Sequence, residues 1–521
     1  MRKHLSIVFA SALLVFTQVS QSYAQDRGPY LIRDAEIESI LKGYARPIFK
    51  AAGLDPDAVE MHIIASKELN AFAANGQQMF FYTALLEQVR SPNELIGVIA
   101  HETGHIAGGH LARPNEGVQN ATATAIASML LGAAAVAAGA PGAGAAIMTS
   151  SGDFAGRVYA KFSRTQESAA DQAGMKYLEK AHESGKGLIS FLQYLGDQTA
   201  LLVKNQDPYV VDHPLTPERV AHLEDVAKKS PYYDTPDTPK HIEQFKRMQA
   251  KLRGFLDPVP RVMQEYPKSD DSLYARYARA VAYHREAHLD QAMAEVKSLV
   301  DQYPDDPYFR ELQGQILLES GKVKESVPPL RQSVKLRPDE PLLQTLLGTA
   351  LVQTGDDAMD KEAIEHLKTA ARLDPNNADT WYQLAAAYTH TGQKGEADLA
   401  TAENYLLTGR ASEAAYVAGR AARNLPKGSP AQLRALDITS VIQANMNDKK
   451  GKRLDLQNPD KPDAVEGFHF YSSGTPPFEQ QQQQQYVPSQ GPQTLWQMRH
   501  PSSQQQQDLR SGYQPQSYWN K

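Results

Sequence analysis

The chain of 521 residues contains no cysteine. This absence excludes disulfide bonds, thiolate metal ligands, cysteine nucleophiles and a lipid anchor on an N-terminal cysteine. Any bound metal must therefore be held by histidine, aspartate or glutamate. The chain also lacks an excess of basic residues, because 54 Lys and Arg stand against 60 Asp and Glu, for a formal net charge of −6. This balance gives no electrostatic reason to expect a nucleic-acid partner.

Long apolar runs are also scarce, and the one at the N-terminus is short. A basic start (residues 2–4) is followed by an apolar stretch (5–15) and by small residues at 22–24. The apolar stretch falls short of the roughly 20 residues that span a bilayer. Residues 1–24 are therefore predicted to be a cleaved secretory signal peptide. A cysteine-free exported chain fits the periplasm, where disulfides are permitted but not required.

The first region of the mature chain, residues 25–230, is predicted to be an α+β domain. Helical patterns surround one β-rich patch, VEMHIIA (59–65) and QQMFFYTALL (77–86). The connection between them, SKELNAFAANG (66–76), is rich in turn residues. Strand and helix patterns thus occur together before a region that is almost wholly helical.

Residues 271–447 carry an internal repeat. Three prolines and three glycines recur at intervals of 34 and then 37 residues, namely Pro304, Pro338 and Pro375, and Gly321, Gly355 and Gly392. A period near 34 with two helices per unit is typical of tetratricopeptide (TPR) repeats. The three extra residues of the second interval fall at DDAMD (356–360), which is expected to be a loop. Such repeats stack into an all-α solenoid whose concave surface binds proteins or peptides.

Three further segments have biased or connecting sequences. Residues 231–270 are predicted to be a helical linker, and the Gln- and Pro-rich residues 448–521 a disordered tail. Residues 121–148 are dominated by alanine and glycine, with a Gly-Ala-Pro-Gly break at 139–142. They are predicted to form a buried helical hairpin, and a lid or a peripheral membrane contact is the alternative.

The sequence HETGH (101–105) lies between apolar and small residues. Histidines four positions apart share one face of a helix, so His101 and His105 can direct their imidazoles at one metal ion. Glu102 can then reach a water molecule bound to that ion. Two solvated histidines are the alternative, but the apolar flanks predict a buried helix, in which polar groups need partners. The pattern H-E-x-x-H is typical of zinc-dependent peptidases.

A zinc site of this kind needs a third protein ligand. His110 is a poor candidate, because it lies about 140° round the helix from His105. Glu167, in KFSRTQESAADQAGMKYL, is a better one. Asp171 lies one turn further along the same helical face, where it can accept a hydrogen bond from the distal nitrogen of a ligand histidine.

Five motifs precede the repeats in a fixed order: RDAEIE (33–38), NAFAANGQQMFFYTALL (70–86), ELIGVIAHETGHIAGGHLAR (94–113), SRTQESAADQAG (163–174) and HPLTPER (213–219). With the repeats behind them, they resemble the periplasmic zinc endopeptidases of the beta-barrel assembly-enhancing protease type. These are relatives of the HtpX and CAAX prenyl protease families. The resemblance covers about residues 28–230 by motifs and 271–447 by architecture, and it implies a zincin-like metallopeptidase domain followed by a TPR solenoid.

The resemblance also implies a site and a role. One zinc ion per chain would be bound by His101, His105 and Glu167, with Glu102 as the general base. Substrates would be unfolded or misassembled proteins of the bacterial envelope, among them outer-membrane β-barrel proteins, and the repeats would bind these clients or the assembly machinery. The alternative is a non-catalytic periplasmic chaperone or assembly scaffold with a peptidase-like domain, which the intact ligand and base residues disfavour. A soluble aminopeptidase is disfavoured because nothing marks a pocket for a free amine.

The β-rich patch is the expected place for the substrate. An extended chain can add as a strand to an exposed sheet edge, with main-chain hydrogen bonds supplying affinity. The residues expected nearest to the cleft are Asn70, Ala71 and Phe72, at the start of the second motif.

His213, in VDHPLTPERVAHL, is a candidate for regulation. Pro214 disfavours helical geometry at His213, so His213 is expected on a loop just before a helix that starts near Pro217. In the resembled family a histidine in this type of motif can approach the metal. His213 is therefore interpreted as an occupant or guard of the fourth zinc position in the resting enzyme. Arg219 is the alternative functional residue, as a donor to the oxyanion, and a His213 that only caps the helix is the plainest alternative.

Overall fold

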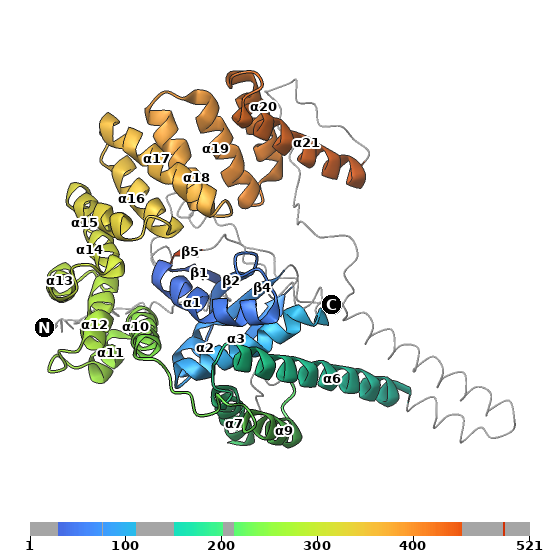
Figure 1. Cartoon of the computed structure of the whole chain (residues 1–521). Helices are drawn as coiled ribbons and strands as arrows, with labels where there is room; N and C mark the ends of the chain where they lie inside the picture. The colour runs from blue at the N-terminus through green and yellow to red at the C-terminus, as the bar shows by residue number, and fades with distance from the viewer. Residues whose placement is uncertain (1–29, 75–76, 111–150, 202–212, 451–492, 495–521) are drawn as a thin grey trace, which may run out of the picture.

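The computed structural model describes residues 30–74, 77–110, 151–201, 213–450 and 493–494. An α+β domain is followed by an all-α solenoid, which confirms the predicted fold class for these two parts (Figure 1). The predicted signal peptide, the segment 121–148 and most of the predicted tail lie outside the described residues. Within the described ranges, no helix is both long enough and apolar enough to cross a membrane.

The described strands form one mixed sheet in the order β3-β4-β2-β1-β5. Their bounds are β1 Tyr30–Arg33, β2 Glu60–Ala65, β3 Ala71–Ala74, β4 Gln78–Tyr82 and β5 Gln493–Thr494. β2 and β4 pair in parallel, and β3 runs antiparallel to β4. The β-rich patch is thus confirmed at β2 and β4. The prediction of turns throughout 66–76 was wrong in one respect, because this connection contains β3.

Two helices pack against one face of the sheet. α1 (Ala35–Ala52) begins where the Asp34 side chain accepts a hydrogen bond from the backbone N–H of Ile37, and α3 (Pro92–Ala107) begins where Ser91 accepts one from Glu94. These caps satisfy backbone donors that have no partner within the helix. Apolar side chains of both helices and of the strands share one buried core.

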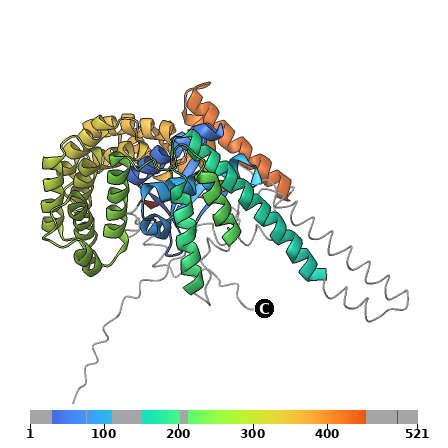
Figure 2. The same ribbon diagram turned by 60° about the horizontal axis from the view of Figure 1, so that its bottom comes forward.

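Four further helices complete this domain: α2 (Thr83–Gln88), α6 (Ser151–Lys180), α7 (Lys186–Leu201) and α9 (Pro217–Ala227). α6 packs against α3 and then extends away from the body of the domain (Figure 2). α9 begins at Pro217, as expected, with Thr216 as its cap. α9 packs against α6, so the residues just before α9 (213–216) also lie beside α6.

The predicted linker is helical and takes part in the core. It contains α10 (Pro239–Leu256) and α11 (Val259–Glu265). Phe245, Met248 and Leu252 of α10 are buried in the same apolar cluster as α1 and α3. α10 therefore belongs structurally to the N-terminal domain as well as to the start of the solenoid, because it also packs against α12.

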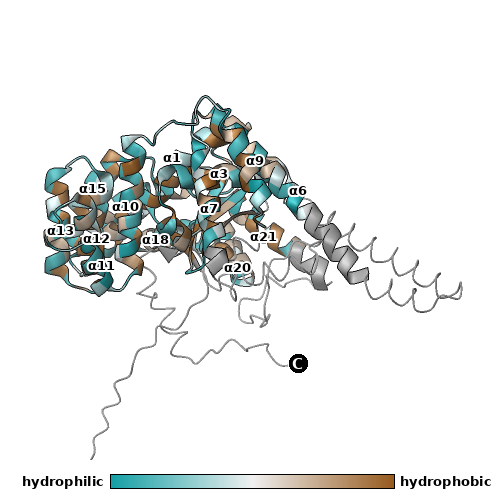
Figure 3. Ribbon diagram, turned by 90° about the horizontal axis from the view of Figure 1, so that it is seen from below, coloured by the Kyte–Doolittle hydropathy of each residue, from teal (hydrophilic) through white to brown (hydrophobic). Residues whose placement is uncertain are grey.

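The solenoid consists of antiparallel helices with alternating apolar and polar stripes (Figure 3). Their bounds are α12 Leu273–Arg285, α13 Leu289–Gln302, α14 Pro307–Glu319, α15 Val323–Leu336, α16 Pro341–Gln353, α17 Asp357–Leu373, α18 Ala378–His390, α19 Lys394–Leu407, α20 Ala411–Asn424 and α21 Pro430–Lys450. The repeat glycines Gly321, Gly355 and Gly392 have positive φ in the turns inside helix pairs. The loop expected at 356–360 is absent: Asp356 caps α17, whose 17 residues absorb the insertion.

Buried charged groups join α1 to α10 and the solenoid. Arg247 of α10 donates to Glu36 at 2.7 Å and to Asp306 at 2.5 Å. Tyr277 of α12 donates to the other oxygen of Glu36 at 2.5 Å. Glu36, Arg247 and Tyr277 are all buried. Loss of the Asp306 or Tyr277 side chain would leave the buried Arg247 or Glu36 without one of its partners.

A second set of ion pairs lies beside the first. Lys251 Nζ is 2.8 Å from Asp34 Oδ2, 3.6 Å from Glu36 and 3.9 Å from Glu311. One Lys251 ammonium thus faces three carboxylates, and its pKa is held well above the ordinary value because these carboxylates outweigh the effect of burial.

Replacing Lys251 with methionine tests this junction. The variant leaves buried carboxylates without their cation, so we expect the free energy of unfolding to fall by about 3–5 kcal/mol. Urea denaturation followed by circular dichroism measures the change. The control is Lys228→Met, which removes an exposed lysine from its Glu224 pair and should change stability by no more than about 0.5 kcal/mol. Equal losses in both variants would contradict the assigned role of Lys251.

Candidate metal centre

α3 brings His101, Glu102 and His105 together in the interior. All three side chains are buried, Glu102 completely. His101 Nε2 and His105 Nε2 lie 3.2 Å apart, one helical turn along the same face. Two imidazole nitrogens at this separation face a common point, as the spacing in the sequence predicts.

α6 supplies one carboxylate to this point and a second to the far side of the His101 ring. Glu167 Oε2 lies 3.4 Å from His101 Nε2, and Glu167 Oε1 lies 3.3 Å from His105 Nε2. Asp171 lies on the far side of the ring, with Oδ1 2.9 Å from His101 Nδ1. The structure therefore brings Asp171 to the distal nitrogen of His101, where it can fix the orientation of the ring.

Glu167 reaches this point because α3 and α6 cross in very close contact. Gly104 faces Ala170, and a Cβ on Gly104 would lie only 2.6 Å from the Ala170 carbonyl oxygen and 2.9 Å from its Cα. These neighbours are backbone atoms, so they cannot rotate away. Gly104, the residue of HETGH that lacks a side chain, thus sets the distance between the two helices.

His213 enters the site from the segment that precedes α9. Its Nδ1 lies 3.3 Å from His101 Nε2 and 3.2 Å from both oxygens of Glu167. Its Nε2 lies 3.5 Å from Glu102 Oε1. The interpretation of His213 as a helix cap is wrong, because the side chain of Thr216 caps α9.

The ligand atoms have the spacing that a zinc ion requires. His101, His105, Glu167 and His213 each offer one atom, and all four atoms lie within 4.8 Å of one another. Zinc–nitrogen bonds of 2.0–2.1 Å in a tetrahedron separate ligand atoms by about 3.3 Å. With Glu167 represented by its Oε1, four of the six separations within this set are 3.2 or 3.3 Å. The residues therefore fit a zinc ion.

Charge interactions hold Glu167 and His105 in the forms that bind a metal. Burial acts to lower the pKa of His101, but Asp171 and Glu167 outweigh it and raise that pKa to about 10, so metal binding at His101 must displace a proton. Burial acts to raise the pKa of Glu167, but His213, His101 and His105 outweigh it and hold that pKa well below its ordinary value. Burial lowers the pKa of His105 to about 3. Glu167 is thus anionic and His105 neutral near pH 7, and these are the states in which carboxylate and imidazole act as metal ligands.

Glu102 lies beside the ligand group and has a different environment. Burial raises its pKa, and the nearby His213 and His101 reduce that rise without cancelling it. The backbone N–H of Ala73 in β3 also faces the carboxylate. Residues 70–76 were expected near the cleft, but the contact of Ala73 with Glu102 was not predicted, because it depends on β3 and the sequence pattern did not indicate that strand.

Arg219 contacts both carboxylates of α6 and thereby supports the site. Its Nε and Nη2 donate to the two oxygens of Asp171 at 2.8 and 2.9 Å, and Nη2 also lies 3.1 Å from Glu167 Oε2. Its Nη1 donates to the Pro214 carbonyl oxygen at 2.7 Å. One guanidinium thus connects α6 to the residue that follows His213.

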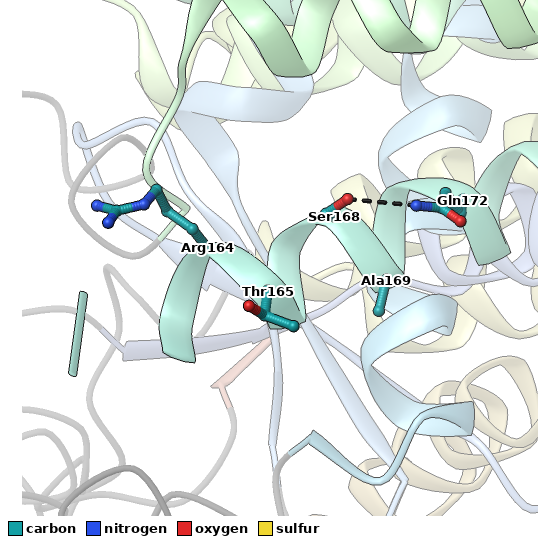
Figure 4. Close-up of a pocket in the computed structure, with 5 residues that line it drawn as sticks. All are labelled: Arg164, Thr165, Ser168, Ala169 and Gln172. Atoms are coloured by element: carbon teal, nitrogen blue, oxygen red, sulfur yellow. Dashed lines mark hydrogen bonds between the residues drawn. The ribbon is translucent and has the colours of Figure 1, made fainter. Parts of the chain in front are cut away.

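Other residues near the site lie outside the ligand group. His110 Nδ1 is 3.2 Å from His105 Nδ1, the nitrogen that faces away from the other ligands. Asn70, Ala71 and Phe72 lie at the start of β3, which packs against α3. A shallow pocket on α6 is lined by Arg164, Thr165, Ser168, Ala169 and Gln172, and in it Gln172 donates to Ser168 at 3.3 Å (Figure 4). These pocket residues include no histidine or carboxylate.

Comparisons with known proteins agree with this geometry. Residues 31–227 match the model of peptidase family M48, and residues 360–392 match a TPR repeat model. The chain is 27% identical over 380 residues to the beta-barrel assembly-enhancing protease of Yersinia pestis, covering 72% of this chain and 76% of that protein. It is 26% identical over 417 residues to the protein of that name in Escherichia coli (strain K12), covering 78% and 82%. Metalloprotease YcaL of the same strain is 31% identical over 184 residues, covering 34% of this chain and 66% of YcaL.

The buried helix pair with its histidines and carboxylate, together with these matches, defines a zinc metalloprotease. Its N-terminal domain matches the model of peptidase family M48, and a segment that matches a TPR repeat model follows it.

The helix crossing can be tested by Gly104→Ala. The added methyl group would force α6, and Glu167 with it, away from α3. We expect the zinc affinity to fall by roughly 10- to 100-fold, which is the usual effect of losing a residue that orients a metal ligand. Competition with a chromophoric chelator measures the affinity. Gly43→Ala in α1 is the matched control, since its Cβ would meet no atom within 4 Å. Unchanged affinity in Gly104→Ala would show that the crossing does not position Glu167.

Proposed function

We propose that this protein is a zinc-dependent endopeptidase of the bacterial envelope that cleaves misfolded or misassembled proteins, including outer-membrane β-barrel proteins. His101, His105 and Glu167 hold the zinc ion, and Glu102 is the general base. The observation that carries the proposal is the convergence of the ligand atoms at tetrahedral spacing beside a buried glutamate. A scaffold without catalysis would have no need to keep Glu102 buried beside this group.

The chemistry follows from the positions of the side chains. When bound, zinc lowers the pKa of a coordinated water and polarises the scissile carbonyl. Glu102 takes the proton of the attacking water and passes it to the leaving amine. Its raised pKa suits both halves of this transfer, because a carboxyl with a pKa closer to neutrality both accepts and releases a proton readily. Asp171 and Arg219 hold His101 and Glu167 in place during the reaction.

The substrate pairs with β3 as an added strand. β3 is the last strand at one side of the described sheet. Tyr82 donates to the Asn70 carbonyl oxygen at 3.0 Å, so residues 70, 72 and 74 exchange hydrogen bonds with β4. The backbone groups of Ala71 and Ala73 then point away from β4, towards the next strand position. Glu102 faces Ala73, so a strand added there runs past the general base.

His213 holds the fourth zinc position in the resting enzyme. The distances from its Nδ1 to His101 and Glu167 support this role, since they equal those within the ligand set. The water that Glu102 must activate needs the same position, so His213 must withdraw before cleavage. Arg219 contacts the Pro214 carbonyl oxygen and thereby steadies this arrangement. This role for Arg219 is better supported than that of oxyanion donor, because its guanidinium already binds Asp171 and Glu167.

The cellular setting completes the proposal. Export through the predicted signal peptide (1–24) delivers the protein to the periplasm. The TPR solenoid binds clients or the outer-membrane assembly machinery, which is supported by the similarity to beta-barrel assembly-enhancing proteases across the greater part of the chain. Residues 121–148 provide either a buried hairpin or a peripheral membrane contact. The predicted disordered tail (448–521) needs correction at two places, because α21 continues to Lys450 and Gln493–Thr494 pair with β1 as β5.

Substitutions of Glu102 and Glu167 separate catalysis from metal binding. Glu102→Gln should retain one zinc per chain and lose cleavage of an unfolded protein substrate by at least about 100-fold, because the general base is removed. Glu167→Ala should lose most of its zinc. Zinc is measured by mass spectrometry, and Glu179→Gln at an exposed position of α6 is the control for both. Full activity in Glu102→Gln would contradict the enzymatic role and favour a chaperone or scaffold.

Substitution of His213 tests the resting state. His213→Ala should keep its zinc and cleave both the unfolded substrate and its own chain faster than the wild-type protein, because the fourth position is then open to water. The initial rate of cleavage and the appearance of fragments on denaturing gels measure this. His222→Ala, at an exposed position of α9, is the matched control. Slower cleavage with unchanged zinc would instead assign His213 to stabilisation of the transition state.

A further inference from the structure

We propose that the aromatic row Phe72–Phe80–His62 makes this protease prefer substrates with an aromatic side chain at the position opposite Phe72. The inference rests on the proposed function, because it takes β3 as the strand with which the substrate pairs. It goes beyond that function by assigning a specificity-determining residue and a class of preferred sequence.

The row crosses the sheet at one level. Phe72 of β3 is the register partner of Phe80 in β4, and Phe80 is the partner of His62 in β2. Partners that lie directly opposite project from the same face of a sheet. This is the face away from the apolar core, since the residues on either side of Phe72, Ala71 and Ala73, are buried against the core.

The rings are stacked in the direction in which strands are added. The Phe72 and Phe80 centroids are 4.9 Å apart with ring planes at 12°, and the Phe80 and His62 centroids are 4.7 Å apart with planes at 23°. These spacings equal the distance of about 4.7–4.9 Å between neighbouring strands. A further strand beyond β3 therefore brings the side chain opposite Phe72 to stacking distance from its ring.

The two faces of the added strand meet different surroundings. On the core-facing side, the neighbouring positions of β3 are Ala71 and Ala73, whose methyl groups offer little contact area. On the other side, the neighbour is the large ring of Phe72, with the edge of Tyr82 also next to it at a centroid distance of 6.1 Å. Because side chains of a strand alternate between faces, selection acts on one substrate position and not on its immediate neighbours.

The preference can be measured with a set of short peptides. In an unstructured host peptide that the zinc-loaded full-length protein cleaves, alanines on both sides of the scissile bond are replaced one at a time by phenylalanine. Stacking of an aromatic pair should raise kcat/KM by about 2- to 10-fold at a single position. The neighbouring positions should give ratios near one. Leucine at the preferred position separates aromatic stacking from general apolar contact.

Variants of Phe72 test whether the preference for an aromatic side chain depends on the aromatic row. In Phe72→Ala the phenylalanine-to-alanine ratio of kcat/KM should fall to about one, whereas Phe72→Tyr should preserve it. The ratio is the readout because a structural disturbance of β3 would lower kcat/KM for the phenylalanine peptide and for the alanine peptide together. Zinc content and thermal unfolding show whether each variant is folded. The same peptides are titrated against Glu102→Gln, so that binding is read without cleavage.

Each outcome has one meaning. A position-specific preference that disappears in Phe72→Ala and remains in Phe72→Tyr supports the proposal. A preference that persists in Phe72→Ala, an equal gain from leucine, or the lack of any preference in either cleavage or binding overturns it. The lack of cleavage of every peptide by the zinc-loaded wild-type protein, with selective binding intact, would contradict the proposed function and not the aromatic row.

Discussion

The close contact of α3 and α6 is the constraint on which the metal centre depends. A helix can align two of its own histidines, but a carboxylate from a second helix reaches the same point only if the two backbones approach closely. The absence of a side chain at Gly104 allows that approach, with Ala170 on the opposing helix. The supporting ion pairs follow from the same crossing, because Asp171 lies one turn beyond Glu167 and meets both His101 and Arg219.

The sequence was most informative where the interaction is local. The four-residue spacing of His101 and His105, the Pro217 helix start and the turn glycines of the solenoid all depend on neighbours within a few positions, and the structure has each of them as expected. β3 was missed because its four residues, AFAA, are bounded by turn residues and are held in the sheet by pairing with β4. The insertion at 356–360 lengthened a helix because Asp356 provided a new cap.

The separation between partners along the chain explains what could not be predicted. His213 was expected near the metal only through the family resemblance, since it contacts Glu167 from 46 residues away, and the contact between Arg33 and Asp374, 341 residues apart, was not predicted. Nothing in the local pattern of RDAEIE (33–38) indicates that its acidic residues will be buried against α10 and the solenoid. The sequence of the motif predicts a helix start with Asp34 as the cap. The pairing of Asp34 and Glu36 with α10 and the solenoid is seen only in the three-dimensional structure.

The buried charges at the start of α1 also have a consequence for the order of folding. A chain synthesised from its N-terminus presents Asp34 and Glu36 long before the partners of these residues, Lys251, Arg247 and Tyr277, have been made. Until then, the first helix has carboxylates that must stay in water, and they cannot yet enter a closed core. α3, which carries the metal centre, packs directly on α1, so the core around both helices can close fully only after α10 and the first solenoid helix have been synthesised.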